Sequence, residues 1–361
     1  RDVSTVLRDL LSDRFRRIGD PSATGLNTGP SESAGAAPSR RRDERNEQNM
    51  SPVGQLDRTR LEYPQRLSTK TNKSMTQSLP VVKKNDELVT QIHRFEGHRR
   101  AFLKVQDGCD AFCTYCIIPQ LRRDLRSKPV TVAVEEARGL VAAGFREIVL
   151  TGVFLGAYGR ETAVRKRFSQ AGSPLAMLVD ALAQIEGLER LRLSSLEPGD
   201  VDGELLETLP SHPVCVPHLH LPLQSGSAEI LRRMNRQYTL DQFVAMIERV
   251  RAALDRPAIS TDLIVGFPGE SEHDFEDSVD VARRAEFVKL HAFPFSPREG
   301  TAAAKWSRQF VPQPIVAERM ERLSELDAEL SLRFRSRFVG GVERVVVEAD
   351  DAVLEPTERG D

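Results

Sequence analysis

Apolar and polar positions follow two different periods between residues 101 and 300. Apolar runs with the period of a strand lie at 102–106, 147–151, 190–194, 218–222, 258–265 and 289–295. Between them, apolar residues at helical spacing predict helices at 134–143, 175–186, 203–209, 227–234, 240–253 and 272–285. Alternating strands and helices indicate βα units around a parallel sheet, so the predicted fold class is α/β. Six such units favour an open, incomplete (β/α)6 TIM-like barrel over a closed eightfold one.

The pattern changes on both sides of this region. Residues 1–80 are predicted to be mostly disordered, because the segment 21–80 is rich in Ser, Gly, Pro, Asn and charge and has few apolar residues. Residues 314–338 carry apolar side chains at helical spacing and predict one long helix. After Gly340 and Gly341, the apolar string VERVVVEAD predicts a further strand.

Composition narrows the choice of partner and compartment. The 361 residues carry a formal net charge of −2, so any contact with nucleic acid has to use local basic patches, for which Arg122, Arg123 and Arg298 are candidates. No apolar run is long enough for a transmembrane helix, which predicts that the protein has no membrane partner. Four cysteines, three of them clustered, do not suggest a disulfide framework and predict a reducing, cytoplasmic location.

The strongest chemical signal is the spacing C-x3-C-x2-C of Cys109, Cys113 and Cys116, directly after the first predicted strand. Soft thiolates at such spacing favour an iron–sulfur cluster or zinc. Three ligands leave one iron of a [4Fe–4S] cluster open, whereas a zinc site needs a fourth ligand from elsewhere. Three structural thiols remain a further alternative. Cys215 stands alone and is predicted to be a buried non-ligand.

Polar or glycine-rich strings follow several predicted strands, and parallel strands bring their carboxyl ends to one edge, where ligands bind. TGVFLGAYG, LSSLEPGD and PHLHLPLQSGS are such strings. Ser194 and Glu197 also suit a helix N-cap and a charged turn. His218 and His220 are predicted to share one side of their strand. A zinc site there lacks a third ligand, which favours polar packing inside the barrel or contact with a ligand.

The string AFLKVQDGCDAFCTYCIIP resembles the signature of radical S-adenosylmethionine (SAM) enzymes, and within them the methylthiotransferases; the similarity covers about residues 99–340. The resemblance implies one [4Fe–4S] cluster on Cys109, Cys113 and Cys116. Its open iron is expected to bind the amino and carboxylate groups of SAM, which is cleaved to a 5′-deoxyadenosyl radical. Residues expected to contact SAM are Tyr115, Gly152, Ser195, Glu197, Gln224, Ser225, Asp262 and Gly266.

Further strings are similar to the branch of this family that acts on N6-threonylcarbamoyladenosine 3′ to the anticodon: CTYCIIP, IVLTGVFLGAYGR, LRLSSLEP and FPFSPREGT. The implied reaction is transfer of a methylthio group to C2 of that base. The implied partners are tRNA, an electron donor such as flavodoxin or ferredoxin, and a sulfur donor. Alternatives are action on isopentenyladenosine in tRNA or on a ribosomal protein, or a degenerate paralogue that binds RNA or cleaves SAM without inserting sulfur.

The resemblance also implies domain boundaries. Residues 81–98 are expected to be a remnant of the N-terminal methylthiotransferase domain, 99–312 the barrel, 313–340 its C-terminal helix, and 341–361 part of a TRAM-like RNA-binding barrel. Family members carry three further cysteines in the N-terminal domain for a second [4Fe–4S] cluster. This sequence has no cysteine before Cys109, so the ligands of that cluster are not present and sulfur insertion is in question.

Overall fold

A computed structural model of the chain describes residues 100–164 and 172–343. The predictions for residues 1–99 and for the strand after Gly341 lie outside this part. Its strands are β1 (Arg100–Asp107), β2 (Arg126–Ser127), β3 (Glu147–Gly152), β4 (Arg190–Leu193), β5 (His218–His220), β6 (Ala258–Val265) and β7 (Lys289–Pro294). Its α-helices are α2 (Ile118–Leu121), α3 (Val130–Ala142), α4 (Pro174–Ala183), α5 (Gly203–Ser211), α6 (Ala228–Arg233), α7 (Leu240–Ala253), α8 (Glu272–Ala285) and α9 (Gln313–Ser336).

All six predicted strands and all seven predicted helices between residues 100 and 343 are confirmed, although several ends differ by a few residues. Helix α3 begins earlier than predicted, at Val130, because Pro129 precedes it with an extended backbone that fits a helix start. The sequence pattern missed the two-residue strand β2, the single turn α2 and four short 3₁₀ segments, which are too short to show a period. These segments are η1 (Leu155–Ala157), η3 (Pro198–Asp200), η4 (Ala303–Lys305) and η5 (Ser307–Gln309).

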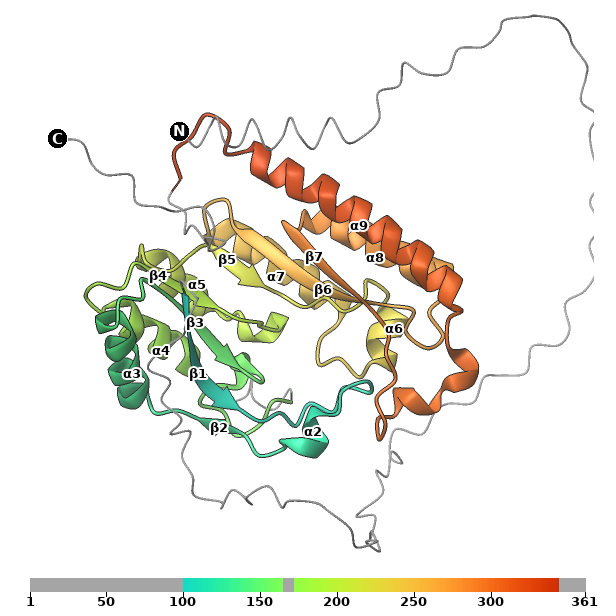
Figure 1. Ribbon diagram of the computed structural model, residues 1–361, viewed down its shortest axis with the longest axis horizontal. Helices are drawn as coiled ribbons and strands as arrows, with labels where there is room; N and C mark the ends of the chain where they lie inside the picture. Colours follow the sequence, from blue (N-terminus) through green and yellow to red (C-terminus); the bar gives the residue numbers. More distant parts are fainter. Residues whose placement is uncertain (1–99, 165–171, 344–361) are drawn as a thin grey trace, which may run out of the picture. The chain divides into compact units, whose positions relative to one another are not determined.

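The strands form two neighbouring sheets, in the orders β2-β1-β3-β4 and β5-β6-β7, and every pairing except β1 with β2 is parallel. Isolated bridges from Leu191 to Cys215 and from Ser195 to His220 join β4 to β5. The result is one curved run of six parallel strands, which Figure 1 shows together with the helices that follow them. This half-barrel confirms the α/β, incomplete TIM-like fold.

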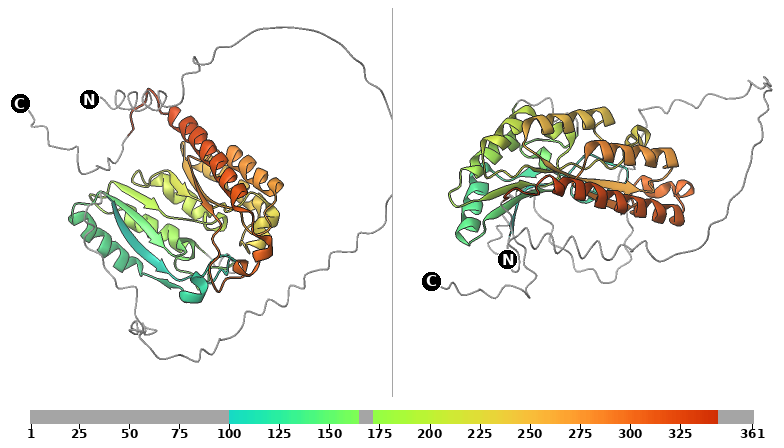
Figure 2. Two further views of the ribbon diagram at one scale, coloured as in Figure 1. Left: turned by 45° about the vertical axis from the view of Figure 1, so that its right-hand side comes forward. Right: turned by 90° about the horizontal axis from the view of Figure 1, so that it is seen from above.

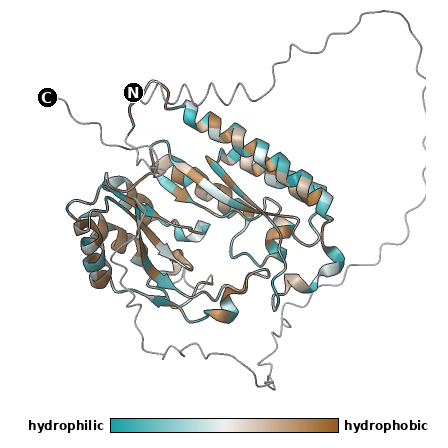
Figure 3. Ribbon diagram, viewed as in Figure 1, coloured by the Kyte–Doolittle hydropathy of each residue, from teal (hydrophilic) through white to brown (hydrophobic). Residues whose placement is uncertain are grey.

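One face of the curved run packs on helices and the other remains polar. Leu191, Leu193 and Leu219 are buried in the main apolar core. The alternate residues of the same strands, Arg192 and His220, belong to the opposite, concave face. Figure 2 shows the helices gathered along one side of the strands, and Figure 3 shows apolar and polar residues alternating along α3 and α9.

Helix α9 closes the open edge at β7. Asp327 accepts hydrogen bonds from the backbone nitrogen of Leu290 at 2.7 Å and from Nζ of Lys289 at 2.5 Å. Near the start of α9, Arg319 forms a buried ion pair with Glu270 at 2.8 Å. These contacts fix the second sheet to α9 and leave its concave face open. None of the helices in the described ranges combines the length and apolarity that crossing a bilayer requires.

Candidate functional site

The three clustered cysteines lie on a loop that leaves the carboxyl end of β1. Gly108 starts this loop with a positive φ of 84°, and a Cβ atom there would lie 2.1 Å from the carbonyl oxygen of Asp124. Only glycine fits this close approach of two backbones. The next residue, Cys109, donates its backbone N–H to the carbonyl of Arg122 at 2.9 Å. The loop therefore closes on itself immediately below the cysteines.

Neighbouring segments hold the tip of this cysteine loop. The backbone nitrogen of Thr114 donates to the carbonyl of Met234 at 3.0 Å, and its carbonyl accepts from Ala303 at 2.9 Å. The side-chain amide of Asn235 donates to the carbonyl of Phe112 at 3.0 Å. Both Phe112 and Asn235 have positive φ angles, of 51° and 57°. Contacts from two sides thus hold a strained backbone in one conformation.

The thiols of Cys109 and Cys113 are buried, and Cys116 is partly exposed; all three are free. Burial raises the pKa of Cys109 to about 12, and the neighbouring Cys113, Cys116 and Glu197 oppose its ionisation further. Burial likewise raises the pKa of Cys113, against the opposing effect of Arg236. The thiols are therefore close enough to interact electrostatically. Without a cation, Cys109 and Cys113 favour the protonated form, and a bound metal would reverse this preference.

The donor set fits an iron–sulfur cluster better than a single ion. Among residues 100–164 and 172–343, no three His, Cys, Asp or Glu side chains lie close enough to hold one metal ion. In a [4Fe–4S] cluster each thiolate binds a different iron, so three sulfurs spread along one loop suit it. Sulfur donors alone also match the preference of iron–sulfur clusters for soft ligands.

Arg236, between α6 and α7, reaches the cysteine loop with its guanidinium group. One terminal nitrogen donates to Oε1 of Glu197 at 2.6 Å, and the other lies 3.1 Å from Sγ of Cys113 and 3.3 Å from the hydroxyl of Tyr115. Its Nε lies 3.3 Å from the hydroxyl of Tyr238. The side chains of Arg236 and Glu197 are each only 7% exposed. A single buried cation thus joins the turn after β4, the cysteine loop and the segment before α7.

The buried guanidinium stays charged. Burial alone would lower the pKa of Arg236, but Tyr115, Tyr238, Glu197 and Cys113 together raise it well above its ordinary value. Burial also raises the pKa of Tyr115 well above its usual range, so the phenol remains neutral. The group therefore offers a fixed positive charge beside a thiol that would be negative when it binds a metal.

Some of the residues predicted to bind SAM meet at this point. Tyr115 and Glu197 both contact Arg236, and Glu197 also caps the 3₁₀ segment η3. Ser195, exposed at the end of β4, bridges to His220. Gln224 follows β5 with a positive φ of 64° and pairs with β6. These four residues come from three segments of the chain, namely the cysteine loop and the stretches that follow β4 and β5.

Two other predicted SAM residues lie in structural positions. Ser225 is 1% exposed, and its hydroxyl lies 3.5 Å from that of Ser278 in α8. Gly266 has a φ of 74°, donates its N–H to Glu270 at 2.7 Å, and has no room for a Cβ atom beside Val316 of α9. Both hold turns after strands against the helices behind them. Their assignment to SAM stays a prediction.

Gly152, at the end of β3, has a close neighbour in β1. A Cβ atom there would lie 3.0 Å from side-chain atoms of Gln106. Gln106 is fully buried; its amide nitrogen donates to the carbonyl of Gly108 at 2.8 Å, and its oxygen accepts from the backbone of Phe154 at 2.7 Å. The small size of Gly152 lets this glutamine link the start of the cysteine loop to the loop after β3.

The two histidines of β5 share one side of the strand, as predicted. The hydroxyl of Ser260 in β6 contacts Nδ1 of His220 at 2.9 Å and Nε2 of His218 at 3.3 Å. Nε2 of His220 lies 3.1 Å from Asp262, the remaining residue predicted to contact SAM. Burial lowers the pKa of His218 to about 4. These residues form polar packing on the concave face, and Asp262 lies inside β6, three residues before its end at Val265.

Sequence reasoning missed Arg236 and Gln106. Arg236 lies in the string MNRQY after a short predicted helix, and nothing in that string marks it as buried. A weak signal existed for Gln106, because it is a polar residue inside an apolar strand just before the cysteines. Both connect segments far apart in sequence, so their roles depend on which strands are neighbours.

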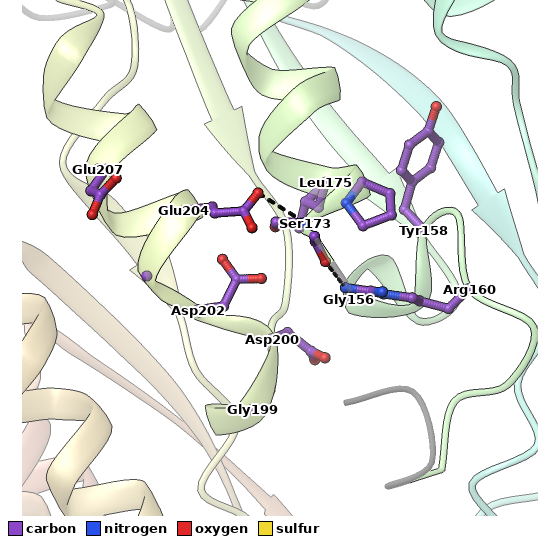
Figure 4. A pocket seen from close by; sticks show the side chains of 13 residues that line it. Gly156, Tyr158, Arg160, Ser173, Leu175, Gly199, Asp200, Asp202, Glu204 and Glu207 are labelled. Atoms are coloured by element: carbon purple, nitrogen blue, oxygen red, sulfur yellow. Dashed lines mark hydrogen bonds between the residues drawn. The ribbon is translucent and has the colours of Figure 1, made fainter. Parts of the chain in front are cut away.

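A separate cavity of about 530 Å³ lies between the starts of α4 and α5, outside the barrel (Figure 4). Four carboxylates line it, from Asp200, Asp202, Glu204 and Glu207. Asp202 accepts from the N–H of Leu205 at 2.8 Å, and Glu204 from that of Ser173 at 3.0 Å. The carboxylates of Asp202 and Glu204 therefore accept backbone hydrogen bonds at the starts of helices. No cysteine is among the residues that line this cavity.

Comparison with known proteins identifies the family of this half-barrel. The family described as "Radical SAM superfamily" matches residues 103–282. The chain is 41% identical over 258 residues to "Threonylcarbamoyladenosine tRNA methylthiotransferase MtaB" of Chlamydia pneumoniae, an alignment that covers 72% of this chain and 59% of that protein.

Relatives named for a different substrate, dimethylallyladenosine, are equally similar. The chain is 42% identical over 260 residues to "tRNA-2-methylthio-N(6)-dimethylallyladenosine synthase" of Parafrankia sp., covering 71% of this chain and 51% of that protein. It is 37% identical to the protein of the same name from Thermotoga petrophila, covering 73% and 58%. The chain thus spans little more than half the length of these relatives, and overall identity does not separate the two specificities.

Proposed function

Because this chain belongs to the radical SAM superfamily, we propose that it forms the SAM-cleaving core of a tRNA methylthiotransferase. The observation that carries the proposal is the cysteine loop at the mouth of a half-barrel, with Arg236 and Glu197 beside Cys113. A zinc knuckle or a set of structural thiols would not need a buried cation aimed at a thiol.

Cys109, Cys113 and Cys116 hold the [4Fe–4S] cluster in this proposal. When bound, the cluster supplies the electron that cleaves SAM reductively. The chain's own residues prepare the site. Thr114 anchors the loop, and burial of Cys109 and Cys113 shields these two sulfurs from water. A fixed loop geometry reduces the reorganisation that electron transfer requires, since the ligands are already in place.

Arg236 has an electrostatic task at this mouth. Its guanidinium would offset the negative charge that Cys113 acquires as a thiolate. Glu197 holds the guanidinium in place through the 2.6 Å ion pair. Tyr115, Gly152, Ser195, Gln224 and Asp262 are proposed to complete the SAM site, with Ser225 and Gly266 supporting it from behind.

The proposed substrate is N6-threonylcarbamoyladenosine 3′ to the anticodon, with transfer of the methylthio group to C2. The strings around the cysteines and after the strands support this choice. RNA loops offer such a base by unstacking it toward the protein. Action on dimethylallyladenosine is the second candidate, because relatives named for that substrate are equally similar. The proposed partners include an electron donor such as flavodoxin or ferredoxin and a sulfur donor, in the cytoplasm.

The test is anaerobic reconstitution of the chain, followed by iron and sulfide analysis and a reductant-dependent assay for 5′-deoxyadenosine. We expect about four irons per chain and SAM cleavage. No iron, or zinc in its place, would overturn the radical SAM function. A chain that cleaves SAM but does not bind an anticodon stem-loop RNA would retain the radical SAM chemistry and lose the proposed tRNA substrate.

A further inference from the structure

The concave wall of the half-barrel carries charged groups below the cysteine loop. Glu147 of β3 is buried, and Arg190 and Arg192 of β4 lie on the same face of the sheet. Nε of Arg190 donates to Glu147 at 2.9 Å, and Nε of Arg192 donates to its other oxygen at 3.0 Å. Arg100 of β1 also approaches Glu147, with its Nε 3.9 Å from the carboxylate, so three guanidinium groups share one buried carboxylate.

Both arginines keep their terminal nitrogens available. Arg190 and Arg192 contact Glu147 only through Nε, and within residues 100–164 and 172–343 their terminal nitrogens have no protein partner. The two side chains are 26% and 20% exposed. A planar guanidinium with two parallel N–H groups is well suited to a bidentate contact with a carboxylate. Glu147 fixes each group from one side, so little freedom is lost on binding.

The other ionisable groups on this wall do not neutralise the arginines. Asp262 is the nearest negative charge on β6, but its carboxylate lies 3.1 Å from Nε2 of His220. Lys289 of β7 pairs with Asp327 of α9. The wall thus combines paired groups near β6 and β7 with an excess of positive charge on β4.

We propose that this wall selects a modified base whose N6 substituent carries a carboxylate, and that Arg192 binds that carboxylate. The proposal rests on the function proposed above and identifies a specificity-determining residue for it. A threonylcarbamoyl substituent carries a carboxylate, whereas a dimethylallyl substituent is apolar. An apolar group against this wall would leave the arginines without their water and without a partner, which disfavours it.

Arg192 lies too far from the mouth of the half-barrel to contact the base itself, but at a distance that the N6 substituent of the base can reach. Arg192 lies three residues before Ser195, which is about 10 Å deeper along an extended strand. Ser195 follows the end of β4 and lies two residues before Glu197, whose partner Arg236 contacts Cys113 of the cysteine loop. A base whose C2 faces the mouth can therefore extend its N6 substituent down the wall toward Arg192.

The experiment measures binding of the full chain to anticodon stem-loop RNAs that differ at one base. The base carries unmodified adenosine, a dimethylallyl group, a threonylcarbamoyl group, or the neutral methyl ester of the latter. We expect the wild-type chain to bind the threonylcarbamoyl RNA about tenfold more tightly than its methyl ester, because only the acid offers a charge-assisted bidentate contact. The ester removes the negative charge and adds only one methyl group, so it tests the wall without any substitution in the protein.

Variants assign the effect to a residue. Arg192→Met should remove the preference for acid over ester and should strengthen binding of the dimethylallyl RNA, because an apolar group then no longer desolvates the charge of Arg192. Arg192→Lys should retain part of the preference, since lysine keeps the positive charge but cannot form the bidentate contact of a guanidinium group. Arg138→Met, on the exposed side of α3, is the matched control and should behave as the wild type.

Equal affinity for acid and ester in the wild-type chain would overturn the inference while leaving the proposed function intact. A preference that survives in Arg192→Met would overturn the role of Arg192. The same acid and ester are also compared as free nucleosides. If the chain binds no anticodon RNA but prefers the free acid, the inference stands and the tRNA function fails; if it binds neither RNA nor nucleoside, both fail.

Discussion

The half-barrel contains two arginine–carboxylate clusters, which differ in how many nitrogen atoms of each guanidinium group have a protein partner. At the mouth, Arg236 contacts Glu197, Cys113 and both neighbouring tyrosines, and its side chain is 7% exposed. On the wall, Arg190 and Arg192 share Glu147 through Nε alone and remain partly exposed. Arg236 is fully engaged and holds a site together, whereas the wall arginines are held on one side and can bind a ligand on the other.

The two clusters should also differ in their contribution to folding stability: the mouth cluster stabilises the fold, whereas the wall cluster is proposed to select the substrate. A buried ion pair is strongly destabilising when only one partner is removed, because the other charge remains in a poorly solvated place. A partly exposed arginine that shares its carboxylate with a second arginine can be lost at small cost. Substitutions of the same chemical kind should therefore have different effects in the two clusters.

The largest expected effect is on the cofactor. Cys113→Ala should reduce the iron bound after reconstitution from about four atoms per chain to near zero, because one of three protein ligands is lost. Cys215→Ala, which removes a buried cysteine elsewhere, and Arg192→Met should both retain their iron. Iron and sulfide analysis of the three variants provides the measurement. Retention of a full cluster by Cys113→Ala would exclude the cysteine loop as the cluster site.

The next effect is on folding stability. Arg236→Met should lower the free energy of unfolding by about 3–5 kcal/mol, since it leaves Glu197 buried without its cation. The double variant Arg236→Met with Glu197→Gln should recover a substantial part of that loss. Urea denaturation of the chain measures both. If the single variant is as stable as the wild type, Arg236 does not hold the mouth together.

A smaller effect depends on pH. Burial lowers the pKa of His218 to about 4 in the folded chain, below its ordinary value of 6.5. The unfolded chain then binds a proton that the folded chain does not, so this contribution to stability is present above pH 6.5 and is lost as pH falls toward 4. Between pH 7 and pH 5, the wild type should lose about 2 kcal/mol relative to His218→Gln. Urea denaturation at several pH values tests this, and parallel pH profiles for the two proteins would contradict it.

The smallest expected effect is that of Arg192→Met on stability. The free energy of unfolding should change by about 1 kcal/mol or less, because Glu147 keeps its 2.9 Å contact with Arg190. The measurement is the same urea denaturation as for Arg236→Met. A loss as large as that of Arg236→Met would show that both clusters are structural, and the comparison between them would no longer hold.

Sequence alone indicated most of the architecture. The strand and helix positions followed from periodicities that depend only on neighbouring residues, and the placement of His218 and His220 on one side of β5 followed from the same alternation. The cysteine spacing also pointed to a metal-binding loop, because ligands within eight residues remain close in almost any fold of the loop.

Other features were decided by tertiary structure. Ser225 and Gly266 matched motifs in the sequence, yet the structure shows their contacts with Ser278 and Glu270 at turns packed against helices. Arg236 carried no recognisable signal, although it joins three segments at the mouth. The reason is physical: a period is set within one element, whereas the partner of a buried charge is set by which elements the folded chain brings together.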